Sequence, residues 1–128
     1  MERNIRMKYM LLTYIDEQAW LSLSEEERQH RMAEAMPHVK RLMGSGKFLG
    51  GGPLDPTSEA STVRLRDGKP LVTDGPFAET REQVGGYTLI DAKDCEEAIA
   101  IAAGFLGTTS PSIIEIRRVA ELEGVPSH

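Results

Sequence analysis

The segment from Met7 to Ile15 limits the fold more than any other because it is apolar on both of its alternating faces. Successive side chains of a strand point to opposite faces of a sheet. One face would carry Met7, Tyr9, Leu11 and Ile15. The other would carry Met10, Leu12 and Tyr14. A strand of this kind is covered on both sides. Helices can supply one cover, and a second subunit is a candidate for the other.

A helix pattern begins at Ser24, which forms a capping box with Glu27. Its apolar residues recur every three or four positions and predict one buried stripe: Met32, Ala35, Met36, Val39, Leu42 and Met43. Pro37 lies inside the pattern and predicts a kink or a restart, because proline lacks a backbone donor. The Gly44-Ser45-Gly46 run predicts the end of the helix.

A second helix is predicted after Asp94, with Glu97 in capping position. Its expected apolar stripe comprises Cys95, Ala98, Ile99, Ala102, Phe105 and Leu106. Gly107 is expected to end it. We interpret Cys95 as a small core residue within this stripe, since free cysteine behaves as a small hydrophobe.

Further strands are predicted over Lys47–Gly52, Val84–Asp91 and Ser112–Val119. A hairpin is predicted from Ser61–Arg66 and Pro70–Thr73, because Asp67-Gly68 readily supplies the positive φ angles of its turn. Without the hairpin, the order of elements is β-α-β-β-α-β. We therefore expect an α+β fold, a ferredoxin-like βαβ repeat with a hairpin insertion. Its antiparallel sheet would have both helices on one face, with Ile114 and Ile116 turned toward them.

Length and composition predict one domain over residues 1–128, with its core at about 7–119 and a tail over 120–128. A net charge of −5 and a pI near 5.2 argue against nucleic-acid binding. One cysteine cannot form a disulfide within the chain. The N-terminus shows no signal-peptide pattern and no apolar run long enough to span a membrane. The expectation is a cytoplasmic protein without membrane contact.

The most distinctive segment runs over residues 73–87, from TDGPF to VGGY. Its first part is expected to be a connection between strands that can include one helical turn. Gly75 and Pro76 predict a sharp turn, and Phe77 is expected to anchor it in apolar surroundings. The Asp74 carboxylate then either accepts backbone hydrogen bonds at this corner or projects into a cavity as a proton-transfer group. Glu79 and Glu82 would share one side of any helical turn.

Of the three histidines, only His38 lies at the edge of the first helix's apolar stripe. It is either a boundary residue or a catalytic imidazole. His30 lies nearly opposite the stripe, where we expect it to be solvated. Since the sequence contains neither HExxH nor CxxC, a zinc site is not expected.

Arginines and a glutamate lie within the predicted strands, among them Arg64, Glu115 and Arg117. On an exposed sheet such residues are ordinary cross-strand ion pairs. Inside a cavity, the arginines would attract a carboxylate or enolate. The sequence leaves both interpretations open.

The run Asp74-Gly75-Pro76-Phe77, with Gly85-Gly86-Tyr87 after it, resembles the signature of the DGPF, or YCII-related, family. Further similarity extends over about residues 7–119. The resemblance implies a dimeric α/β barrel of ferredoxin-like subunits with a cavity, and relatives proposed to use a His–Asp pair. It also implies a genomic association with sigma factors of stress responses. Asp74 matches the family's aspartate, and His38 is nearest in kind to the histidine.

Two functions from different classes follow as expectations. The first is a small-molecule enzyme without metal or cofactor, of isomerase or lyase type, in which Asp74 and His38 are the catalytic residues. Its ligand-binding candidates are Arg64, Arg117, Glu79 and Glu82. The alternative is a non-catalytic ligand-binding or regulatory module. In both cases the expected partners are a second copy of the chain and a small molecule.

Overall fold

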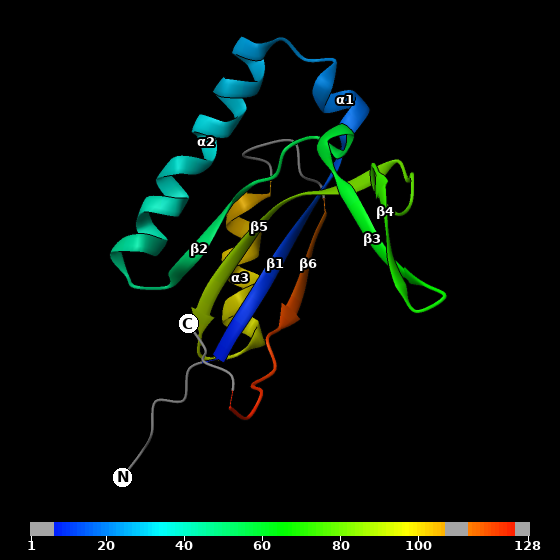
Figure 1. Ribbon diagram of the computed structural model, residues 1–128. Helices are drawn as coiled ribbons and strands as arrows, with labels where there is room; N and C mark the ends of the chain where they lie inside the picture. The colour runs from blue at the N-terminus through cyan, green and yellow to red at the C-terminus, as the bar shows by residue number, and fades with distance from the viewer. Residues whose placement is uncertain (1–6, 107–112, 125–128) are drawn as a thin grey trace.

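A computed structural model describes residues 7–106 and 113–124 (Figure 1). Its main sheet is antiparallel, with strand order β2-β5-β1-β6. These strands are β1 (Met7–Asp16), β2 (Phe48–Pro53), β5 (Glu82–Ala92) and β6 (Ile113–Arg118). The expected antiparallel α+β architecture is confirmed. With the hairpin set aside, the connectivity is consistent with the ferredoxin-like pattern.

The two principal helices are α2 (Glu25–Gly44) and α3 (Cys95–Phe105). Both predicted N-caps are confirmed, because the side chains of Ser24 and Asp94 accept hydrogen bonds from the backbone N–H groups three residues later. Helix α2 ends as expected before Gly46, whose φ is 76°. The restart expected at Pro37 is wrong, since α2 continues through this residue.

Helix α3 packs on the sheet face that carries Tyr9, Leu11 and Ile90, all three of which are buried (Figure 1). Other core residues are Leu42, Ala92, Ala98, Ile101 and Ala102. The alternation predicted for the first strand is therefore confirmed on this face. Ile114 and Ile116 pack against the same core, as expected for the last strand.

Four sequence expectations about apolar residues are wrong. Leu106, placed in the stripe of the second helix, follows the last residue of α3 and is 43% exposed. Cys95 is exposed, because it is the first residue of α3 and its side chain lies outside the helix–sheet contact. Ile99 is likewise exposed, and Ile101 takes its place in the core. Phe77 is 79% exposed and does not anchor its turn within this chain. Gly107, expected to end α3, lies outside the described residues.

Helix α2 departs most from expectation. Of its predicted stripe only Leu42 is buried, while Met32, Met36 and Met43 are each more than 40% exposed. The sequence pattern identifies the apolar face of a helix but not the distance to the next layer. Here the first half of the helix stands away from the sheet, so its stripe borders open space instead of core (Figure 1).

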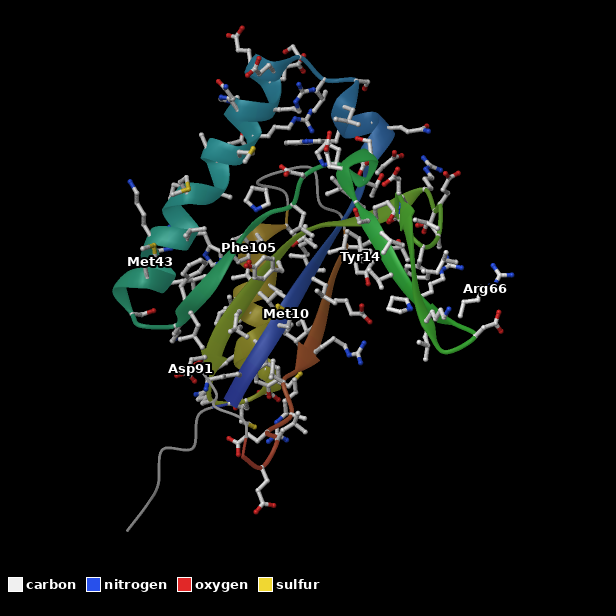
Figure 2. The ribbon with its side chains drawn as sticks, viewed as in Figure 1. Met10, Tyr14, Met43, Arg66, Asp91 and Phe105 are labelled. Atoms are coloured by element: carbon white, nitrogen blue, oxygen red, sulfur yellow. The ribbon has the colours of Figure 1, made fainter. Side chains whose placement is uncertain are left out.

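Neither of the two principal helices covers the opposite face of the sheet, and no other described helix lies over it. Figure 2 shows Met10 and Tyr14 on this face of β1. Met10 pairs with Leu89 and Arg117 on the neighbouring strands, and Tyr14 pairs with Val84 and Ile113. Tyr87 is 40% exposed there. Part of an apolar sheet face is thus open to solvent in the single chain.

The predicted hairpin is confirmed as β3 (Ser61–Arg66) and β4 (Lys69–Asp74), a separate two-stranded sheet. Both Asp67 and Gly68 have positive φ, as its tight turn requires. Val63 pairs with Val72, and both are more than 60% exposed. Two-stranded hairpins are marginal in water on their own, and this one leaves its apolar face exposed.

Candidate functional site

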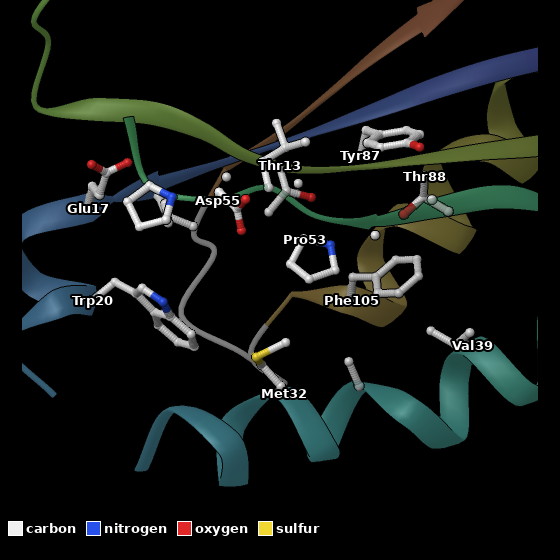
Figure 3. A pocket seen from close by; sticks show the side chains of 18 of the residues that line it. Thr13, Glu17, Trp20, Met32, Val39, Pro53, Asp55, Tyr87, Thr88 and Phe105 are labelled. Atoms are coloured by element: carbon white, nitrogen blue, oxygen red, sulfur yellow. The ribbon is translucent and has the colours of Figure 1, made fainter. Parts of the chain in front are cut away.

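A cavity of about 510 Å³ lies between α2 and the helix-bearing face of the sheet (Figure 3). This volume suits a small organic ligand. Helix α2 contributes Met32, Ala35, Met36 and Val39. The sheet contributes Thr13, Ile15, Phe48, Gly51, Gly52, Gly85, Gly86 and Thr88. Phe105, at the end of α3, closes one side, and Trp20 lies toward the other (Figure 3).

The end of the cavity near Trp20 is built by α1 (Glu17–Leu21), a short helix absent from the sequence predictions. Asp16 caps it by accepting a hydrogen bond from Ala19. The Glu17 carboxylate accepts two kinds of hydrogen bond from Thr57. The backbone N–H of Thr57 donates at 3.1 Å, and the Thr57 hydroxyl donates at 2.6 Å. Thr57 opens the 3₁₀ helix η1 (Thr57–Glu59), so this contact ties α1 to the segment after β2.

Two glycines of the cavity wall, Gly51 and Gly85, lie where neighbouring groups leave no room for a side chain. A Cβ at Gly51 would lie 2.9 Å from the Cα of Thr88, and the φ of Gly51 is 151°. At Gly85, a Cβ would lie 2.6 Å from Cδ1 of Ile15. Gly85 lies at a register shift between β1 and β5, where one residue is extra. Side chains at these positions would displace the strands or Ile15.

His38 faces α3 and does not line the cavity. Its Nε2 lies 2.9 Å from the carbonyl oxygen of Ile101, and its ring meets Phe105 edge to face, with centroids 4.5 Å apart. A Cβ at Gly104 would collide with the imidazole. His38 therefore occupies a notch between the two helices, where it acts as a packing contact. His30 is 77% exposed and pairs with Glu34, as expected for a solvated residue.

Asp74 ends β4, is exposed and is not part of the cavity wall. Among the described residues, its carboxylate makes no hydrogen bond. The corner after it is instead held by backbone groups: the N–H of Gly75 donates to Ala60, and its carbonyl accepts from Thr62. No helical turn forms between β4 and β5, and both Glu79 and Glu82 are exposed.

The two candidate arginines also lie outside the cavity. Arg64 donates to the carbonyl oxygen of Phe77 at 3.3 Å. Arg117 lies 3.9 Å from Glu115 on the open sheet face. The hydroxyl of Tyr14 donates to Glu115 at 2.8 Å, and this hydrogen bond raises the pKa of the Tyr14 phenol, with desolvation and the charge of Glu115 adding to it. Arg117 and Glu115 belong to the same strand, β6, and the contact that crosses strands is the Tyr14–Glu115 hydrogen bond. Neither is the cross-strand ion pair that one interpretation of the sequence predicted.

Within the described part of one chain, no hydrogen bond or ion pair joins His38 to Asp74, Arg64 or Arg117. Sequence reasoning overlooked Glu17, Trp20 and Asp55, which all line the cavity. One sequence pattern does predict α1. Asp16 is a favoured N-cap residue, and the apolar pair Ala19-Trp20 follows it.

The described residues contain no group of three His, Cys, Asp or Glu side chains placed to hold a metal ion. No described helix has the length and apolar character needed to cross a bilayer.

Comparison with known proteins identifies the family. A family model described as the YCII-related domain matches residues 7–123. A Rhizobium meliloti (strain 1021) protein, described as uncharacterized protein R00369, is 36% identical over 116 residues. The match covers 89% of this chain and 93% of that protein. The chain belongs to the YCII-related family.

Proposed function

We propose that this protein binds a small, largely apolar molecule in the cavity between α2 and the sheet, without chemical conversion. The main support for this proposal is the apolar face of α2. Its residues Met32, Ala35, Met36 and Val39 border the cavity instead of packing into the core. Exposed apolar side chains around a concave site are typical of ligand pockets. Binding without catalysis is favoured because His38 and Asp74 both lie outside the cavity wall.

We propose further that the working form is a homodimer of ferredoxin-like subunits, arranged as the dimeric α/β barrel that the family resemblance implies. The open sheet face around Met10 and Tyr14 and the apolar hairpin face of Val63 and Val72 support this proposal. Both surfaces belong to every copy of the chain. A two-fold contact can therefore bury both at once, as self-complementary dimer interfaces do.

The binding proposal is tested with N-phenyl-1-naphthylamine, an uncharged apolar probe, and with Trp20 as reporter. Trp20 is the sole tryptophan and lines the cavity, so occupancy changes its emission. We expect saturable quenching in the wild type and weaker binding in Ala35→Phe, which fills the cavity. Ala33→Phe is the matched control, because Ala33 is exposed and is not a lining residue. Equal binding by the wild type and both variants would contradict this location.

A further inference from the structure

We infer that the cavity selects an organic cation: a molecule with an apolar body and one ammonium or similar group. This inference rests on the proposed binding function and adds the charge of the ligand to it. It differs from the sequence expectation, in which arginines would hold an anion.

The charged groups that line the cavity are all of one sign. Among the described lining residues, Glu17 and Asp55 are the two carboxylates, and there is no lysine, arginine or histidine. The nearby guanidinium of Arg28 is outside the lining and donates to the carbonyl oxygens of Leu21 and Leu23. A concave apolar wall strengthens the effect of the two negative charges, because it excludes part of the screening solvent.

The carboxylates lie at one end. Figure 3 shows Glu17, Asp55 and Trp20 toward the α1 side, whereas Phe105 and Val39 lie toward the opposite side. The cavity is thus polarised along its length, with an acidic end and an apolar end. A ligand with its cationic group near α1 and its hydrocarbon body toward Phe105 would match both ends.

Glu17 is held in place for this role. Both of its oxygens accept hydrogen bonds from the backbone N–H of Thr57. The Thr57 hydroxyl donates to one of them as well. A carboxylate with a fixed orientation loses little side-chain entropy when a cation approaches.

Trp20 supplies a second feature that favours a cation. It lies three residues after Glu17 on α1, and its indole borders the same end of the cavity (Figure 3). The faces of aromatic rings, of tryptophan above all, attract cations within about 6 Å of the ring centre. The acidic pair and the indole therefore act on the same part of a ligand.

The test compares three probes with one naphthalene body by titration calorimetry: 1-naphthylmethylamine, 1-naphthylmethanol and 1-naphthoate. We expect the ammonium to bind about tenfold more tightly than the alcohol, which is the effect of about 1.4 kcal/mol of charge interaction. The carboxylate should bind more weakly than the alcohol. The preference for the ammonium should shrink in Asp55→Asn and further in Glu17→Gln/Asp55→Asn, while alcohol binding persists.

Glu59→Gln is the matched control, because Glu59 is an exposed acid of η1 outside the lining. Urea unfolding of each variant separates loss of binding from loss of structure, and Asp55→Asn, at an exposed position, carries the test if Glu17→Gln does not fold. Equal affinity for all three probes, or tighter binding of the carboxylate, would overturn the inference and leave the binding proposal intact. If none of the probes binds the wild type, the binding proposal itself fails.

Discussion

The Nε2 atom of His38 in α2 lies 2.9 Å from the carbonyl oxygen of Ile101 in α3. This hydrogen bond, together with the edge-to-face contact of His38 on Phe105, joins the helices where α2 approaches the sheet. Because Phe105 is also a wall of the cavity, His38 supports the site from outside.

His38→Ala should lower the free energy of unfolding by about 1–2 kcal/mol, the sum expected for one hydrogen bond and one aromatic contact. Urea unfolding measures the loss. His30→Ala is the matched control in the same helix, because His30 is exposed, and it should change stability by less than about 0.5 kcal/mol. Equal effects of the two substitutions would mean that the contact with Ile101 contributes nothing.

Gly104→Ala should destabilise the protein by about 1–3 kcal/mol, because its new methyl group would collide with the His38 ring. In a His38→Ala background the same change should become neutral or stabilising, since the ring is gone and alanine favours a helix more than glycine. A double-mutant cycle by urea unfolding measures this coupling. Additive effects of the two substitutions would show that the His38 ring does not lie against Gly104.

Asp16 makes stability depend on pH. Its carboxylate accepts from the N–H of Ala19 and from Arg81, and these contacts, Ala19 first, lower its pKa. A carboxyl group with a lowered folded-state pKa stabilises the fold above its unfolded pKa of about 3.9, and this contribution is lost as pH falls through the lower folded value.

Asp16→Asn should therefore flatten the fall in stability below about pH 4, measured as urea midpoints between about pH 2 and 6. Asp67→Asn is the control, at an exposed hairpin turn whose left-handed φ asparagine tolerates. It should keep the wild-type profile. An Asp16→Asn profile that parallels the wild type would show that the contacts with Ala19 and Arg81 do not form in solution.

Val63→Lys should weaken the proposed homodimer about tenfold or more, because it places a charge on the apolar face of the hairpin. Leu71→Lys is the matched control, since Leu71 pairs with Arg64 on the opposite face of the same hairpin. Sedimentation equilibrium measures both dissociation constants. A wild-type monomer, or a Val63→Lys dimer of unchanged affinity, would contradict the proposed role of this face.

Short-range patterns predicted much of the fold. The alternation of Met7–Ile15 identified the face that holds Tyr9 and Leu11, because side-chain direction in a strand has a strict period of two. The caps at Ser24 and Asp94 were predictable for a similar reason, since each needs only a local hydrogen bond.

The site was less predictable, because it depends on distances between layers. The sequence pattern of the apolar residues in α2 is the same whether Met32 and Met36 face a core or a cavity. Only the placement of α2 away from the sheet decides this. The orientation of Glu17 depends on its hydrogen bonds with Thr57, which lies 40 residues later in the chain. A local sequence pattern does not predict such a contact.

The most direct test of the proposed ligand site follows the methionine methyl groups by NMR while N-phenyl-1-naphthylamine is added to the labelled protein. Met32 and Met36 line the cavity, Met43 is on the same helix outside it, and Met10 is on the other face of the sheet. The probe's ring currents should shift the methyl resonances of Met32 and Met36 in a saturable way and leave those of Met43 and Met10 in place. Shifts at Met10 with none at Met32 and Met36 would contradict the proposed site.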